Sequence, residues 1–245
     1  MPQRVLEICV DSLDLALAAV RGGADRLELC GPLCDGGVTP SAGFVAVARR
    51  MIDLPLAMLV RPRAGSFTPS GAEFQVMRQD ILYARNLGID IIVLGLLLSD
   101  QTIDMERTRE LVELARPLEV TFHRAFDVSP NLEESLASVI QTGATRVLTA
   151  GGQASAVLGA ATVKELRKTA DNRIGFLLCG GITAATVCSA LETSNVVEVH
   201  AGLRNSARTA LSAGSFEVFT ASVDALRQKI RSMDGRCKST ELPIA

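Results

Sequence analysis

Short apolar runs alternate with longer amphipathic stretches along this chain, and the alternation occurs eight times. Apolar runs bounded by turn residues predict buried parallel strands, and apolar side chains at helical spacing predict helices between them. The expected strands are Val5–Val10, Leu27–Cys30, Leu56–Arg61, Ile89–Leu94, Val120–His123, Arg146–Thr149, Ile174–Cys179 and Val196–His200. The expected helices are Ser12–Arg21, Ser41–Met51, Ser70–Asn86, Asp104–Ala115, Asn131–Gln141, Leu158–Thr169, Thr183–Leu191 and Ser215–Ile230. Eight such units, of about 31 residues each, predict a single-domain TIM (β/α)8 barrel over residues 1–245.

Glycines at three joins between a helix and the next strand support this count. Gly23, Gly88 and Gly143 each stand where a helix would end and where a left-handed residue is often needed. The alternative is an open doubly wound sheet, but no G-x-G-x-x-G follows the first strand. We therefore expect an α/β barrel without a nucleotide cofactor.

Composition excludes several classes of function. The net charge of −2, with one Tyr and no Trp, offers neither a basic footprint nor a stacking platform for nucleic acid. The longest apolar run, Ile91–Leu98, is too short to span a bilayer, and the N-terminus has no apolar signal core. We expect a cytoplasmic protein without membrane contact, whose six cysteines are reduced thiols or metal ligands. Apolar patches on barrel helices also predict a homodimer or higher homo-oligomer.

The strands carry charged residues on the face expected to point into the barrel. Because side chains alternate across a strand, the inward set comprises Glu7, Cys9, Asp11, Arg26, Glu28, Cys30, Arg61, Thr121, His123, Thr149, Glu198 and His200. Buried charges must be paired, so one interpretation is a salt-bridged core without chemistry. The other is a polar pocket at the C-terminal mouth, where TIM-barrel sites lie. We favour the pocket because charged residues continue into the loops beyond the strands.

Three inward residues are candidates for acid–base work, namely Glu7, Glu28 and His123. The chain has two histidines, His123 and His200, and each ends an expected strand. A single histidine is more often a satisfied core residue than a catalyst. Two at the mouth of a barrel favour a role as acid, base or metal ligand.

The loops after the expected strands six to eight suggest an anion site. Gly180 and Gly181 follow strand seven and precede an expected helix start at Thr183, where backbone N–H groups and the helix N-terminus would favour negative charge. A tight turn would also use two glycines. The residues expected to bind a phosphate, sulfate or carboxylate are Gly151, Gly152, Gly180, Gly181, Arg61, Arg63 and Arg204.

Cys9 and Cys30 fall near the ends of neighbouring inward faces. Adjacent parallel strands are about 4.8 Å apart, so two thiols there could hold a soft ion such as Cu(I). Buried cysteines also serve as small hydrophobes, and spacing alone favours that interpretation.

The strings that carry these residues resemble the CutC copper homeostasis family, from about Arg4 to Arg204. The matching strings are E-I-C-V-D-S (7–12), G-G-A-D-R-L-E-L-C (22–30), G-G-V-T-P-S (36–41), R-P-R (61–63) and the particularly specific T-F-H-R-A-F-D (121–127). The resemblance implies a cytosolic TIM barrel linked to copper, with Cu(I) bound by Cys9 and Cys30. The chain departs from the family pattern at Ala64, Ser66, Ala150, Cys179, Gly202 and Leu203, and residues 205–245 are divergent.

Two functions therefore remain open from the sequence. The first is a copper homeostasis protein that binds and traffics Cu(I). The second is a TIM-barrel enzyme acting on a small anionic, possibly phosphorylated, metabolite. In that enzyme Glu7, Glu28 or His123 would transfer protons, while Arg61 and Arg63 would clamp the anion.

Overall fold

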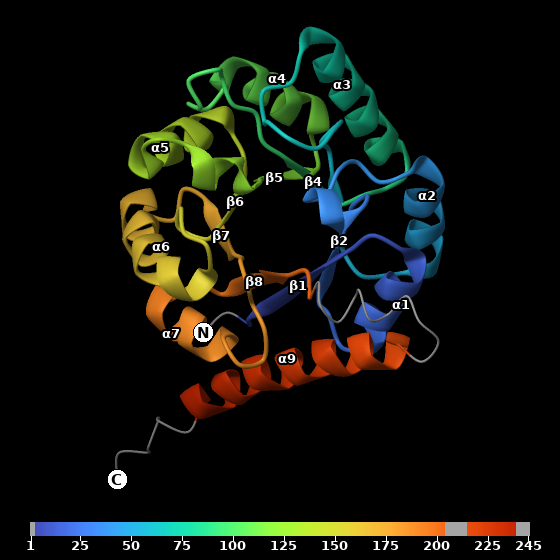
Figure 1. Cartoon of the computed structure of the whole chain (residues 1–245), viewed down its shortest axis with the longest axis vertical. Coiled ribbons are helices and arrows are strands. Elements are labelled where there is room, and N and C mark those ends of the chain that lie inside the picture. The colour runs from blue at the N-terminus through green and yellow to red at the C-terminus, as the bar shows by residue number, and fades with distance from the viewer. Residues whose placement is uncertain (1–2, 204–214, 239–245) are drawn as a thin grey trace.

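The chain forms a closed barrel of eight parallel strands in sequence order, surrounded by helices (Figure 1). A computed structural model describes residues 3–203 and 215–238. The strands are β1 Val5–Val10, β2 Arg26–Leu29, β3 Leu56–Leu59, β4 Ile91–Leu94, β5 Glu119–Phe122, β6 Arg146–Thr149, β7 Gly175–Leu178 and β8 Glu198–Ala201. β1 pairs with both β2 and β8, which closes the sheet and confirms the predicted TIM barrel.

The helices lie outside the barrel. They are α1 Leu13–Arg21, α2 Ala42–Met51, α3 Gly71–Asn86, α4 Met105–Ala115, α5 Leu132–Thr142, α6 Ala156–Ala170, α7 Val187–Ser194 and α9 Ser215–Lys238, with short 3-10 helices η1 Leu33–Asp35 and η2 Arg124–Val128. Side chains at the N-cap explain where several of them begin. Ser70 forms a capping box with Glu73, and Asn131 accepts from two backbone N–H groups of α5. Gly23, Gly88 and Gly143 all have positive φ, as predicted.

Alternation along the strands separates two layers of side chains. Leu6, Ile8 and Val10 of β1 belong to the main apolar core between the sheet and the helices. Cys9 and Cys30 belong to a separate inner cluster with Ala57, Leu59, Ile91 and Val93. The predicted division of β1 and β2 into two faces is therefore confirmed. Among the described residues, no helix is long and apolar enough to cross a membrane.

The loop after β7 differs from the prediction. The helix begins at Val187, four residues later than the expected start at Thr183. Thr186 explains the delay, because its Oγ1 accepts from Thr183 N at 2.9 Å and donates to the Gly181 carbonyl at 2.9 Å. These bonds hold the preceding residues in a turn, so Gly180 and Gly181 lie in a loop and not at a helix N-terminus.

Candidate functional site

A layer of ion pairs crosses the interior of the barrel below its mouth. Arg26 on β2 donates to Glu7 Oε2 at 2.5 Å and to Glu198 Oε2 at 2.7 Å. Arg146 on β6 lies 3.0 Å from the same Glu198 carboxylate. Pairing offsets much of the cost of burying these charges. The layer thus forms a fixed polar floor under the mouth.

His200 stands on this floor at the boundary between β8 and β1. Its Nδ1 lies 2.7 Å from Glu7 Oε1 and 3.3 Å from Glu28 Oε2. The two carboxylates outweigh burial and raise the pKa of His200 above its usual value. Arg26 and His200 together hold the pKa of Glu7 at about 2, despite its complete burial. The predicted acid–base residue Glu7 is therefore a fixed anion that orients the imidazole.

Glu28 is the carboxyl group of the floor that lacks a full set of partners. It is 4% exposed, and its Oε2 makes no hydrogen bond with any described residue. Burial and the nearby Glu7 charge raise the pKa of Glu28 to about 7, although His200 and Arg26 oppose the shift. Near neutral pH this carboxyl can therefore both take up and release a proton. In its ionised form it can bind a cation.

Cys9 and Cys30 lie together beside the floor, near the C-terminal ends of β1 and β2. Cys9 belongs to β1, and Cys30 directly follows β2. Their sulfurs are 3.4 Å apart, and both residues are buried. The contact with Cys30 and burial raise the pKa of the Cys9 thiol well above its usual value, and the Glu28 charge adds to the effect. The structure thus brings together the two thiols that the sequence placed on neighbouring faces.

His123 occupies a separate, apolar environment. Its ring packs 4.9 Å from the Phe67 ring, and its Nδ1 accepts a hydrogen bond from Ala125 N at 3.2 Å. Burial and the charge of Arg61 lower the pKa of His123 to about 3, so the imidazole is neutral. The histidine ion pairs among the described residues are those of His200, and His123 forms none with them. Its partners are those of a core residue that fixes the loop after β5, and they do not match its predicted acid–base role.

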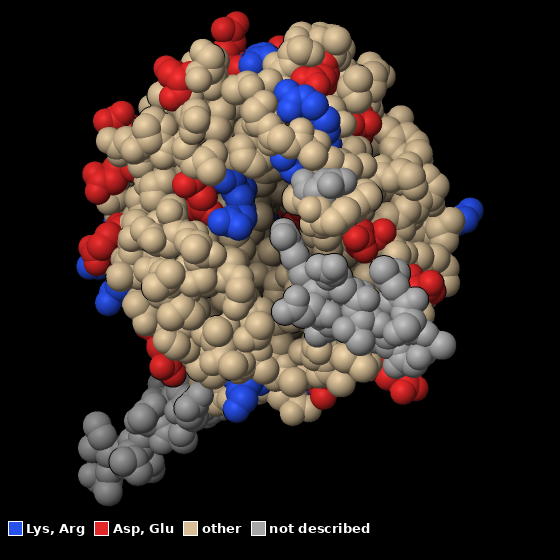
Figure 2. Space-filling model, in the orientation of Figure 1, with Lys and Arg blue, Asp and Glu red and all other residues tan. Residues whose placement is uncertain are grey.

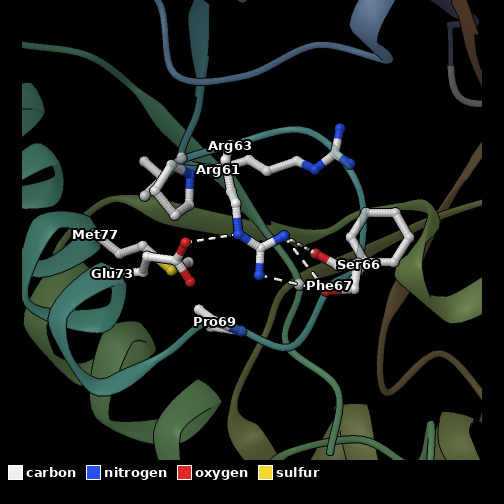
Figure 3. A pocket seen from close by; sticks show the side chains of 10 residues that line it. Arg61, Arg63, Ser66, Phe67, Pro69, Glu73 and Met77 are labelled. Carbon is white, nitrogen blue, oxygen red and sulfur yellow. Dashed lines mark hydrogen bonds and ion pairs between the residues drawn. The ribbon is translucent and has the colours of Figure 1, made fainter. Parts of the chain in front are cut away.

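Arg61 and Arg63 belong to the loop between β3 and α3, and both guanidinium groups bind other groups of the protein (Figure 3). Arg63 binds Glu73 at 2.6 Å and also donates to Ser66. Arg61 donates to the Gly37 and Gly65 carbonyls, each at 2.8 Å, and lies over the Phe67 ring. Both line a pocket that does not contain Gly180 or Gly181. The predicted clamp of these arginines around an anion beside Gly181 is therefore not assembled.

The glycines after β6 also have their N–H groups occupied. Gly152 N donates to Asp127 Oδ1 at 3.0 Å, and Gly151 N donates to Thr149 Oγ1 at 2.8 Å. Asp127 additionally accepts from Ala150 N and Thr149 Oγ1. The Asp127 carboxylate thus accepts hydrogen bonds from the loop after β6 that we predicted to contribute to an anion site. Arg204, the third predicted arginine, lies outside the described residues.

A cavity of about 430 Å³ opens above the floor at the mouth. Figure 2 shows this end of the barrel hollowed at its centre, with basic and acidic side chains around the hollow. The residues that line the cavity include Cys9, Arg124, Cys179, Gly180, Gly181, Thr183 and His200. Gly180 and Gly181 have φ values of +100° and +66°, and neither donates a backbone hydrogen bond to a described residue.

Arg124 lines the cavity, although it is not among the residues predicted to bind an anion. Its Nε binds Asp127 Oδ2 at 3.0 Å, and its Nη groups make no hydrogen bond with a described residue. It follows His123 in the T-F-H-R-A-F-D string, so its position just beyond a strand end was the available signal. Alternation gave no guidance, because Arg124 belongs to η2 and not to β5.

Comparisons with known proteins point to one family. The family model described as CutC family matches residues 4–205. A CutC family protein from Chromobacterium violaceum is 42% identical over 208 residues, covering 85% of this chain and 84% of that protein. The human copper homeostasis protein cutC homolog is 41% identical over 201 residues, covering 82% and 74%. The crystal structure of a CutC protein from Streptococcus agalactiae superposes with a TM-score of 0.77 at 31% identity, covering 81% and 98%.

Proposed function

The chain belongs to the CutC family, and on that premise we propose that it serves copper homeostasis by binding Cu(I) through Cys9 and Cys30. The relatives from human and mouse are named copper homeostasis proteins. The observation that carries the proposal is the 3.4 Å separation of the two buried sulfurs. Thiolates are the ligands that a soft monovalent ion prefers.

The surroundings of the two thiols favour reversible binding of Cu(I) over its permanent storage. Cys9 lines the mouth cavity, so an ion bound there can enter and leave along one side of the barrel. Because the pKa of Cys9 is raised, Cu(I) must displace a proton to bind, and its affinity rises with pH. Cytoplasmic conditions, which we propose for this protein, keep such thiols reduced.

An anaerobic Cu(I) titration against a competing chelator tests the proposal. We expect one site in the unaltered protein and at least a tenfold weaker site in the double variant Cys9→Ser, Cys30→Ser. Cys188→Ser is the matched control, because Cys188 packs in α7 away from the mouth and should leave binding unchanged. Equal affinity in the double variant would overturn the proposal.

A second function, binding of a small anionic metabolite, is favoured by the rim of the same cavity. There Gly180 and Gly181, whose N–H groups donate to no described residue, line the cavity together with Arg124. Successive backbone N–H groups in a turn can form a concave nest that suits an anion, and arginine adds charge and directed donors. We propose Arg124 as the cation of this site in place of Arg61 and Arg63, which are engaged elsewhere.

A further inference from the structure

We infer that Cys9, Glu28 and His200 form a second metal site, distinct from the Cu(I) pair and suited to a divalent cation such as Zn²⁺. One ligand atom from each of these residues lies within 4.8 Å of the other two. The three residues come from β1, β2 and β8, which are neighbours in the closed sheet. The inference goes beyond the proposed copper function, although both sites use Cys9.

The three donors match the chemistry of zinc better than that of Cu(I). A thiolate, an imidazole and a carboxylate are all accepted by Zn²⁺, whereas the carboxylate is a hard ligand that Cu(I) does not favour. Ligand atoms around a tetrahedral zinc are about 3.5 Å apart, given bond lengths of about 2.0–2.3 Å. A metal would therefore draw the three side chains slightly inward from their present positions.

The Oε2 atom of Glu28, which makes no hydrogen bond with a described residue, is the independent sign of a missing partner. Its side chain is 5% exposed, and Oε2 lies 3.3 Å from His200 Nδ1 without forming a hydrogen bond. A buried carboxylate oxygen without a donor is costly and uncommon in native proteins. A cation held between this oxygen, Cys9 and His200 would satisfy it.

Glu7 prepares His200 to act as a ligand. The 2.7 Å contact between Nδ1 and Glu7 Oε1 fixes the ring and places its proton on Nδ1. A metal can therefore bind at Nε2 by displacing the second proton of the ring, since Nε2 has no hydrogen-bond partner among the described residues. A carboxylate behind a histidine is the usual outer-shell arrangement that orients a zinc-bound imidazole.

The balance of charges in the floor also favours a divalent ion. Glu7 is balanced by Arg26, and Glu198 is balanced by Arg146. A metal that binds His200 takes the place of its second proton, so the ligand is the neutral imidazole. The remaining charges are then those of the Glu28 carboxylate and an ionised Cys9. A 2+ ion neutralises both, while a monovalent ion leaves one buried negative charge. The cavity that Cys9 and His200 line leaves room for a fourth ligand, such as water or a small anion.

Titration of the metal-free full-length protein with Co²⁺, followed by competition with Zn²⁺, tests the inference. A thiolate-to-cobalt charge-transfer band reports sulfur ligation, and visible d–d bands report tetrahedral geometry. We expect one site, and about tenfold or greater loss of affinity in Glu28→Gln and His200→Gln. Cys30→Ser should bind Co²⁺ within about threefold of the unaltered protein, and Cys9→Ser should lose the charge-transfer band.

The same variants separate this inference from the copper proposal. Glu28→Gln and His200→Gln should retain Cu(I), whereas Cys30→Ser should lose it, and Cys188→Ser should change neither ion. Far-UV circular dichroism and thermal melts identify any variant that fails to fold, in which case His200→Asn and Glu28→Ala replace it. Unaltered Co²⁺ affinity in folded Glu28 and His200 variants, or no binding at millimolar Co²⁺, would overturn the inference. Equal Co²⁺ losses in Cys9→Ser and Cys30→Ser would also overturn it, since the metal would then lie between the thiols.

Discussion

His200 and Glu7 lie opposite each other on β8 and β1, the two strands whose pairing closes the barrel. Their side chains meet with 2.7 Å between Nδ1 and Oε1, and Arg26 contacts the other oxygen of the same carboxylate. The buried Glu7 carboxylate therefore connects His200 and Arg26 where β8 pairs with β1. This contact makes Glu7 a residue on which both stability and the mouth chemistry depend.

Glu7→Gln should lower the free energy of unfolding by about 3 kcal/mol, because it leaves a buried arginine with one carboxylate fewer. Urea unfolding followed by circular dichroism measures this change, since the chain has no Trp. The matched control is Glu165→Gln, which removes a solvent-exposed pair with Lys168 and should cost less than about 1 kcal/mol. Equal losses in the two variants would contradict the buried network.

The stability of the protein should depend on pH through His123. Its pKa is about 3 in the folded chain against 6.5 ordinarily, so the unfolded chain takes up a proton below pH 6.5 that the folded chain refuses. Stability from this group is complete above pH 6.5 and is lost as the pH falls towards 3. Between pH 7 and 5 the loss is about 2 kcal/mol.

His123→Asn tests this dependence, because Asn retains an oxygen near Nδ1 but does not titrate in this range. Urea unfolding at pH 7 and pH 5 should show a decline about 2 kcal/mol smaller in the variant than in the unaltered protein. His200 is present in both proteins, so its opposite contribution cancels. Parallel declines would show that His123 is protonated in the folded chain.

Gly95→Ala should destabilise the protein by about 1–3 kcal/mol through overpacking. A Cβ at this position would lie 2.3 Å from His123 Nδ1, and the buried ring has little room to move. Gly43→Ala is the matched control, because a Cβ there meets nothing within 4 Å and Gly43 lies within α2. That change should be neutral or stabilise by about 0.5 kcal/mol. Thermal melts of the two variants should therefore shift in different ways.

Arg124→Gln should weaken binding of inorganic phosphate at the mouth by about tenfold, since a charge-assisted bond is worth about 1.5 kcal/mol or more. Isothermal calorimetry with phosphate measures the affinity. Arg63→Gln is the control, because Arg63 is paired with Glu73 and lines another pocket. If both variants bind phosphate like the unaltered protein, the anion site is not at Arg124.

Much of the architecture was predictable because its causes are local. Apolar runs and their spacing marked all eight strands, and the alternation within Val5–Val10 put Glu7 and Cys9 on the inner face. Successive side chains of a strand point to opposite faces of the sheet. The face of each residue therefore follows from its neighbours in the sequence, without knowledge of distant segments. The proximity of Cys9 and Cys30 follows in the same way once β1 and β2 are neighbours.

The partners of the long charged side chains were decided by the tertiary structure. Arg61 and Arg63 fall just beyond a strand, yet the Arg61 guanidinium binds the carbonyls of Gly37 and Gly65. The Arg63 guanidinium binds Glu73 in the first turn of α3. An arginine reaches several ångströms along rotatable bonds, so sequence position alone does not say which acceptor it meets. Arg124 borders the cavity instead, because η2 turns the chain there after β5.

Local patterns in the sequence were enough to predict the barrel, the inward faces of its strands and the proximity of the Cys9 and Cys30 thiols. Only closure of the sheet brings His200 to Glu7, 193 residues away. The same closure leaves Glu28 Oε2 beside them without a hydrogen bond to a described residue. Local patterns reflect backbone geometry and burial, which act over a few residues. Electrostatic pairing acts through space, so it is settled only when β8 returns to β1.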